Sequence, residues 1–527
     1  MFYKTTPAYF SLTISYLSLA YTYLKMNELH EFIKSLDPAE LSFLKKNAEK
    51  KGQSSAKYLE VMDAIRAQPV YDEAALLKKF RREKFVKQFS VMKNYLFHVI
   101  ADTLTAKNLI DEPQNCLVGV ILRIHFFKDK GLYALAESEL KSGLKIATET
   151  EAFVQELELL SIQRYLIINR FSSDSYDTLI TNQKLTQDTL ALYQNLLDYT
   201  NLHAEFTLLL DKSFNANAGK SSADFEAIFS NAMIQDESKA LSKRALLEAL
   251  LLKTAYYNIT HQTDLFFEMA SRAFDLAHQS EWHLSFDKMR LLSTYHQKMH
   301  AAWIVGRLNE IKDTLEKLNS FKPQNEVQEL AAFCYFTSFS LVYFQHTHEN
   351  EKLLEAIHKA YQLIKERGAK LRFDVRKQLI ISCMSGAIES GEYVHALDWS
   401  LLYRAYDTNN RLDMRMVIEM MELIAHTELK NIVLVHNLSQ GIYQRALRWG
   451  EKGGFESVFI SFFKKLSTSI DPDEKIKVFE KSKEDLNKLS DEHVSSQHQA
   501  LYAIFNAYLA SKIAGKPYHL FMKNFKS

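Results

Sequence analysis

The chain is poor in the two residues that most often end helices and shape turns. Among its 527 residues, 14 are glycine and 7 are proline, about 4 % together, against roughly 12 % in an average protein. Leu, Ala, Lys, Glu and Gln, which lose little side-chain freedom in a helix, dominate the remainder. Since sheets need more turn residues than this, the sequence predicts an all-α fold.

The length and the charge of the chain set further limits. A single compact core rarely grows to 527 residues, so the chain must divide or elongate. Its 65 Lys and Arg residues are balanced by 64 Asp and Glu residues, so any attraction to nucleic acid or to an anionic membrane must be local. The three cysteines lie far apart and form no CxxC pair, which excludes a disulfide framework and favours a reducing, cytoplasmic location.

The first 25 residues leave three interpretations open. Residues 7–24 carry no charge and could be a signal peptide or a membrane anchor. Lys4 and the apolar run before Ala20 make a thin signal-peptide pattern, so secretion stays open if residues 1–20 are a signal. The many Ser, Thr and Tyr residues fit a spanning helix poorly. Because amphipathic patterning begins directly after Met26, residues 1–25 are treated as an uncertain leader or a non-native extension.

Two helix starts are explicit in the sequence. Asp37 precedes Pro38, and Glu40 completes a capping box, so a helix is expected to begin at Pro38. Asp471 and Pro472 repeat the pattern near the C-terminus. Apolar residues at three- and four-residue spacing fill the chain between them, and short breaks predict the turns of helix hairpins at residues 51–53, 129–131 and 389–391.

Five windows share a common pattern of aromatic or aliphatic residues followed by small ones. Their anchor positions are 136, 270, 311, 356 and 396, which lie 134, 41, 45 and 40 residues apart. A gap of 134 residues has room for three units of similar length. We therefore expect weaker copies between residues 150 and 250, one of them centred on Ala227.

These windows resemble the second helix of the tetratricopeptide repeat, and the segment from Gly391 to Leu397 (GEYVHAL) is the best match. The spacing exceeds the usual 34 residues of that family, and large residues replace the small one of its first helix. The resemblance covers roughly residues 115–410. It implies an α-solenoid of antiparallel helix hairpins, with tetratricopeptide-like repeats over residues 111–450 and C-terminal helices over 451–527 that cap the array.

Residues 26–110 fall outside the repeat pattern and are predicted to be a separate, basic helical module. A short helix, a turn and a long helix through Leu104 are expected, an arrangement that resembles the N-terminal region of uncharacterised bacterial helical-repeat proteins. Residues 45–93 hold 13 Lys and Arg against 6 acids. A solvated face, an anionic protein partner and nucleic acid all fit this charge, and six residues could contact phosphates: Lys78, Lys79, Arg81, Arg82, Lys84 and Lys87.

No motif for catalysis, a cofactor or a metal is convincing. Gly219-Lys220-Ser221 ends like a phosphate-binding loop, but Phe214 stands where the loop needs glycine. His296 and His300 have the i, i+4 spacing of metal ligands but no third ligand, and His346 and His348 point apart on a helix. In the tetratricopeptide register, the residues expected to line a partner-binding groove are His296, His300, Trp303, Gln345, Gln378 and Ser385.

The resemblance implies a non-catalytic scaffold that binds a protein or peptide in this groove. The alternative is a DNA-binding transcriptional regulator, in which a helix-turn-helix-like module over residues 26–110 contacts DNA and the repeats sense a ligand or dimerise. No cofactor is expected in either case, and no membrane contact unless residues 7–24 are an anchor.

Overall fold

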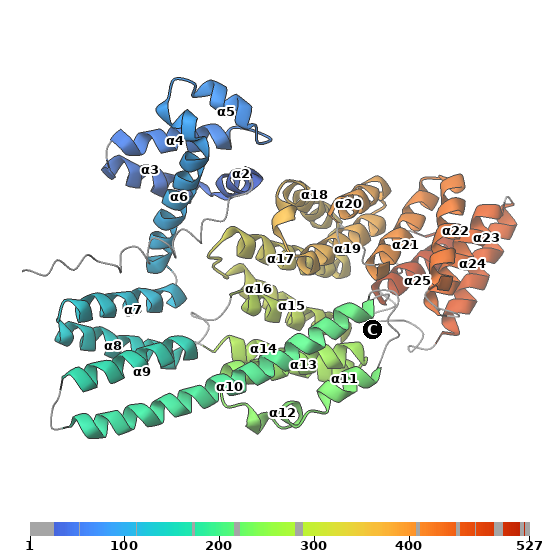
Figure 1. The fold of residues 1–527 in the computed structure, drawn as a ribbon. Helices are drawn as coiled ribbons and strands as arrows, with labels where there is room; N and C mark the ends of the chain where they lie inside the picture. The colour runs from blue at the N-terminus through green and yellow to red at the C-terminus, as the bar shows by residue number, and fades with distance from the viewer. Residues whose placement is uncertain are drawn as a thin grey trace, which may run out of the picture. The chain divides into compact units, whose positions relative to one another are not determined.

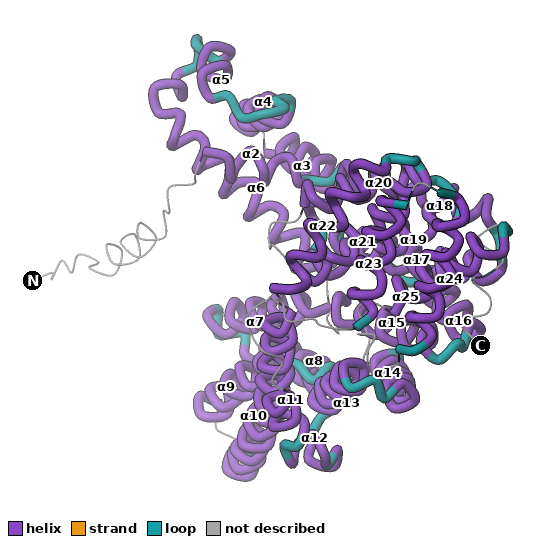
Figure 2. The backbone as a smooth tube through the Cα atoms, turned by 90° about the vertical axis from the view of Figure 1, so that its right-hand side faces the viewer, coloured by secondary structure: helices purple, strands orange, loops and turns teal. Residues whose placement is uncertain are grey.

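A computed structural model describes most of the chain, namely residues 26–51, 53–111, 113–170, 174–214, 222–279, 288–406, 412–448, 454–469, 471–489, 499–516 and 521. Every regular element in these segments is a helix, and short loops join the helices (Figures 1 and 2). The all-α prediction is therefore confirmed. The chain forms two compact units, unit 1 over Met1–Ala136 and unit 2 over Glu137–Ser527. This division lies beyond residue 110, where the sequence suggested the end of the N-terminal module.

Unit 1 is a small bundle around its own core. Its described elements are α2 (Met26–Ser35), α3 (Pro38–Lys51), α4 (Gln53–Arg66), α5 (Glu73–Lys79), the 3-10 helix η1 (Lys84–Gln88), α6 (Phe89–Asp111) and α7 (Pro113–Asp129). The apolar faces of α2, α3, α4 and α6 meet in a core that includes Ile33, Leu44, Ile65 and Leu96. The expected order of a short helix, a turn and a long helix is confirmed by α5, η1 and α6.

The capping box at the start of α3 is present as predicted. The backbone N–H of Glu40 donates to Asp37 Oδ1 at 2.7 Å, and the backbone N–H of Asp37 donates to Glu40 Oε2 at 2.9 Å. Each residue thus satisfies a backbone group that the helix leaves unpaired. In unit 2, the Asp471 side chain caps α24 by accepting from the backbone N–H of Asp473, and Pro472 occupies the first turn.

Unit 2 begins within α8 (Tyr133–Glu149) and is helical throughout its described residues. Its further elements are α9 (Phe153–Asn169), α10 (Ser175–Phe214), α11 (Ser222–Phe229), α12 (Ala232–Gln235), η2 (Glu237–Lys239), α13 (Lys243–Ile259), α14 (Thr263–Ala277), α15 (Lys288–Ile304), α16 (Leu308–Asn319), α17 (Glu326–Thr347), α18 (Asn350–Arg367), η3 (Gly368–Lys370), α19 (Phe373–Glu389), α20 (Tyr393–Tyr406), α21 (Leu412–Glu428), α22 (Ile432–Arg448), α23 (Phe455–Thr468), α24 (Pro472–Asn487) and α25 (Gln499–Ala514).

One turn geometry recurs between consecutive helices. A residue with positive φ ends the first helix, and the next helix begins two residues later. In each case the N–H after the positive-φ residue donates to the carbonyl five residues earlier at 2.8–3.0 Å, the bond of a Schellman cap. The positive-φ residues are Gly131, Glu151, His261, Gly306, His348, Gly391 and Lys430. The turns predicted at 129–131 and 389–391 are confirmed, whereas Gly52 lies outside the described residues.

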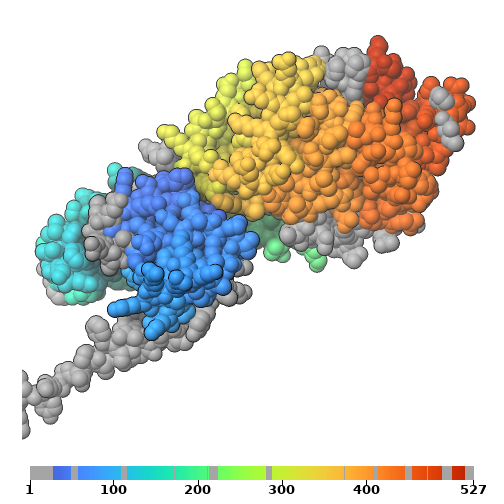
Figure 3. Space-filling model, turned by 90° about the horizontal axis from the view of Figure 1, so that it is seen from above, coloured from blue at the N-terminus to red at the C-terminus, as the bar shows by residue number. Residues whose placement is uncertain are grey.

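The last five of these turns lie at regular intervals in unit 2. They fall at residues 261, 306, 348, 391 and 430, that is 45, 42, 43 and 39 residues apart. From α13 to α25 each helix packs on the next one in sequence, and α15, α17, α19, α21 and α23 also pack on one another in that order. One continuous apolar core runs through these helices, from Leu247 to Leu509. In space-filling form the helices after α15 (yellow to orange) present a closely packed surface (Figure 3).

The region between the turn at Glu151 and the turn at His261 differs from the prediction. Hairpin copies were expected between residues 150 and 250, but residues 175–214 form one helix of 40 residues, α10 (Figure 1). Ala227 lies in α11, a helix of 8 residues. The prediction of hairpin copies between residues 150 and 250 is therefore wrong for residues 175–229. The N-terminal half of α10 packs on α9 and its C-terminal half on α13, so this helix connects the α8–α9 hairpin with the helices that follow α13.

Candidate functional site

The two histidines chosen from the sequence lie on one face of α15, together with aromatic rings. Because they are four residues apart, their rings are neighbours, with centroids 5.8 Å apart. The ring of His296 lies 4.9 Å from Tyr335 and 5.7 Å from Phe339, both on α17. The ring of His300 lies 6.0 Å from Trp303 in a stacked arrangement. The face is thus built where α15 packs on α17.

Both histidines are neutral at physiological pH. Burial lowers the pKa of His296 to about 3, and the nearby His300 and Lys377 lower it further. Burial and Lys377 also lower the pKa of His300 to about 4. A neutral imidazole has one N–H donor and one acceptor nitrogen, so each ring can exchange hydrogen bonds with a peptide group.

The ring nitrogens of this pair are available for such bonds. Within the described residues the side chains of His296 and His300 form no hydrogen bond. Both side chains are half-buried, so part of each residue reaches the surface. Gln378, on α19, is likewise half-buried and has no hydrogen-bond partner among the described side chains. These three side chains hold unused hydrogen-bonding capacity.

A second group of the predicted residues lies where α17 packs on α19. Gln345 is only 8 % exposed, and its Nε2 donates to Glu389 Oε2 at 2.7 Å and reaches Ser385 Oγ at 3.5 Å. Its amide is therefore occupied, and Gln345 holds Ser385 and Glu389 in place instead of facing a partner. Ser385 itself is half-buried. Of the six predicted groove residues, Gln345 is the one that the structure buries.

The α15–α19 cluster, as we define it, combines predicted residues with others that the sequence did not single out. Its members are His296, His300 and Trp303 on α15, Tyr335 and Phe339 on α17, and Lys377 and Gln378 on α19. Lys377 supplies the positive charge near both histidines. It directly precedes Gln378, so the register that picked out Gln378 could also have found Lys377. Tyr335 and Phe339 had no signal beyond their apolar spacing.

The other residues weighed for chemistry have structural roles or fall outside the structure. Among the described residues no group of three or more His, Cys, Asp or Glu is placed to hold a metal ion. His346 Nδ1 lies 2.8 Å from the carbonyl of Val342, and His348 occupies a left-handed turn with φ 60°. Residues 218–221, which hold the Gly-Lys-Ser sequence, lie outside the described residues.

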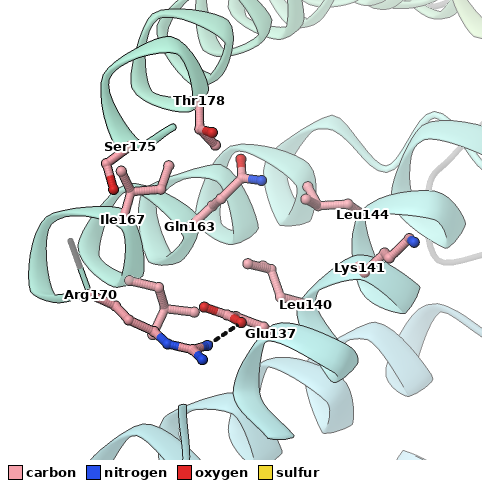
Figure 4. A pocket seen from close by; sticks show the side chains of 10 residues that line it. Glu137, Leu140, Lys141, Leu144, Gln163, Ile167, Arg170, Ser175 and Thr178 are labelled. Carbon is pink, nitrogen blue, oxygen red and sulfur yellow. Dashed lines mark hydrogen bonds and ion pairs between the residues drawn. The ribbon is translucent and has the colours of Figure 1, made fainter. Parts of the chain in front are cut away.

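A pocket of about 360 Å³ lies between α8, α9 and the start of α10 (Figure 4). Its walls include Leu140, Leu144, Leu166 and Ile167, and the rim is polar. Arg170 Nη1 donates to Glu137 Oε2 at 2.5 Å across one side, as the dashed line in Figure 4 shows. This pair neutralises two of the charges, and the aliphatic side chains share the lining with Lys141, Gln163, Ser175 and Thr178. None of its residues was predicted, because they come from three helices and no sequence spacing shows how those helices pack.

The six basic residues predicted to contact phosphates gather at one place in unit 1. Lys78 and Lys79 end α5, Arg81 and Arg82 lie in the following turn, and Lys84 and Lys87 lie in η1. All six are exposed. Within the described part of the chain none of the six forms an ion pair.

Comparisons with known proteins add no identification. Neither a family model nor a curated protein matches this chain. In the segments that the structure describes, no helix combines the length and the apolar character needed to cross a bilayer. Residues 7–24, whose sequence left an anchor open, are not among these segments.

Proposed function

We propose that the chain is a non-catalytic, cytoplasmic scaffold that binds a peptide or protein segment at the α15–α19 cluster. The recurring turns and the packing of α15, α17, α19, α21 and α23 on one another support an α-solenoid of tetratricopeptide-like hairpins in unit 2. The free cysteines support a reducing location.

One observation carries the proposal of a peptide ligand. His296 and His300 keep unused donors and acceptors beside the rings of Tyr335 and Trp303. Gln378, next to Lys377 on α19, has an unused amide. A peptide chain presents one N–H and one C=O per residue, so it can pair with such groups while its side chains cover the rings. Trp and Tyr are enriched among the residues that carry most of the binding energy at protein interfaces.

Selection from a random peptide library displayed on phage tests the proposal on the full chain. We expect enriched peptides whose affinity, measured by calorimetry, falls about tenfold or more in the double variant His300→Ala and Gln378→Ala, since two or three hydrogen bonds of about 1 kcal/mol are lost.

The matched control is His358→Ala with His395→Ala. These two histidines also form a pair, with centroids 4.6 Å apart, but lie on α18 and α20. Affinity should not change in this control. If no peptide is enriched, or if both double variants lose affinity equally, the proposed site is refuted.

The regulator hypothesis has less support. A helix-turn-helix module reads bases with the N-terminal residues of a recognition helix. In unit 1 the exposed cations lie at the C-terminal end of α5, in a turn and in η1, a 3-10 helix of 5 residues. This placement favours contacts with phosphates over contacts with bases.

A further inference from the structure

We propose that residues 78–87 of unit 1 form a docking surface for the sugar-phosphate backbone of duplex DNA, without reading the base sequence. This surface, which we call the α5–η1 ridge, comprises the exposed side chains of Lys78, Lys79, Arg81, Arg82, Lys84 and Lys87. The inference is independent of peptide binding by unit 2.

The ridge keeps its positive charge because the nearby acids are already neutralised. Glu83 is the acid within the segment, and Lys57 Nζ lies 2.6 Å from its Oε1. Glu73, at the start of α5, is paired with Lys93 at 2.7 Å and accepts a hydrogen bond from the Tyr71 hydroxyl. The six ridge cations therefore have no carboxylate partner within the described residues.

The backbone beneath the ridge is fixed by aromatic packing. Phe80 lies 5.6 Å from Phe85, and Phe85 lies 6.3 Å from Phe89, measured between ring centroids. Phe80 and Phe89 are 8 % and 5 % exposed and belong to the core of unit 1. These phenylalanines lie four or five residues apart and hold the backbone of the ridge in one conformation. Less entropy is then lost when the cations meet a rigid array of charges.

The same packing selects duplex DNA among polyanions. Proteins that hold single strands stack the bases on exposed aromatic rings, but the rings of this segment face the core. Binding to a lipid surface is strengthened by exposed apolar side chains that insert beside the cations, and Phe80, Phe85 and Val86 are buried or largely so. Duplex DNA carries one phosphate charge per about 1.7 Å of its axis, a dense and rigid array that six clustered cations can match.

Fluorescence anisotropy with the full chain and a mixed-sequence duplex of about 20 base pairs tests the inference. Six phosphate contacts predict that the logarithm of the affinity falls with the logarithm of the salt concentration with a slope of about −5. Between 50 and 200 mM salt the affinity should then fall about 10³-fold. A second duplex of unrelated sequence should bind equally well.

A variant with glutamine at all six ridge positions removes the positive charge of the ridge. Because these side chains are exposed and form no ion pair, its helix content should not change, and its affinity at low salt should fall at least 100-fold.

The matched control removes the same charge elsewhere, with glutamine at six exposed lysines of unit 2: Lys184, Lys239, Lys312, Lys359, Lys464 and Lys477. It should bind the duplex like the unaltered chain, since a general loss of charge would weaken both variants alike.

Other polyanions serve as competing ligands in the same assay. Polyglutamate, single-stranded DNA and vesicles containing one fifth phosphatidylserine should each bind more weakly than the duplex at the same salt. The inference is overturned if the duplex does not bind at 50 mM salt, if the ridge variant binds like the control, or if any of the three competitors binds better than the duplex.

Discussion

Gly391 offers a test of the recurring turn in which two identical substitutions should have opposite effects. It joins α19 to α20 with φ +80°, and the N–H of Glu392 donates to the carbonyl of Ala387 at 2.8 Å. A Cβ at this glycine would meet no atom within 4 Å. Gly391→Ala therefore changes the backbone preference and adds no clash.

The expected loss of stability in Gly391→Ala follows from this backbone preference. A residue with a Cβ loses about 1–2 kcal/mol in the left-handed conformation, and the narrower unfolded ensemble of alanine returns about 0.4–1 kcal/mol. The net destabilisation is about 1 kcal/mol, or roughly a fivefold increase in opening of the α19–α20 hairpin.

Gly441→Ala is the matched control, because Gly441 lies inside α22. Its Cβ would lie 3.5 Å from Arg445 Nη1, an ordinary contact. Alanine is better than glycine in a helix by up to about 1 kcal/mol, so opening should decrease. Hydrogen exchange followed by mass spectrometry measures both openings on peptides from each hairpin. If the two substitutions shift exchange in the same direction, the left-handed turn at Gly391 is wrong.

Two further predictions concern charge. In the folded state the pKa values of His296 and His300 lie well below the ordinary value of about 6.5. The unfolded chain therefore gains protons first as the pH falls below 6.5, and stability should decrease by about 1–2 kcal/mol per histidine between pH 7 and pH 5. Urea unfolding at both pH values should show a smaller decrease in His300→Gln, and an equal decrease would contradict the assignment. Glu419 is 3 % exposed and pairs with Arg415 and Arg445. Glu419→Gln should cost about 2–4 kcal/mol at pH 7, measured by urea unfolding, whereas Glu484→Gln at the surface should cost less than about 1 kcal/mol.

The sequence predicted those parts of the fold that depend on local chemistry. The scarcity of glycine and proline indicated helices, the capping residues Asp37 and Asp471 marked two helix starts, and Gly131 and Gly391 marked turns. The turns at His261, His348 and Lys430 have the same geometry but no glycine, so tertiary packing must hold these residues in the left-handed region. Helix α10 was missed although residues 175–214 contain neither glycine nor proline, the signal that could have revealed it.

The part of the candidate site that one helix supplies was predictable from residue spacing, and Gln378 on α19 was found from the repeat register alone. His296 and His300 could be paired from their spacing, because four residues make about one helical turn. Lys377, Tyr335 and Phe339 belong to other helices, and their proximity to the histidines depends on how α15, α17 and α19 pack. Gln345 fell in the expected register but is buried, because its amide is used between α17 and α19.

The length of α10 constrains how this part of the chain can change. With 40 residues it extends about 60 Å, and Asn182 bonds to α9 while Tyr199 bonds to the carbonyl of Met233 near α13. A single residue inserted between these two anchors would turn one against the other by about 100° and break one set of contacts. Seven inserted residues complete nearly two turns and leave only about 20°, but they also lengthen the helix by about 10 Å. Glu151, in the turn before α9, accepts from the N–H groups of Lys243 and Arg244 at 2.8 Å, and such a lengthening would break these bonds. The number of residues between the two anchors of α10 is therefore fixed by the helices packed against it.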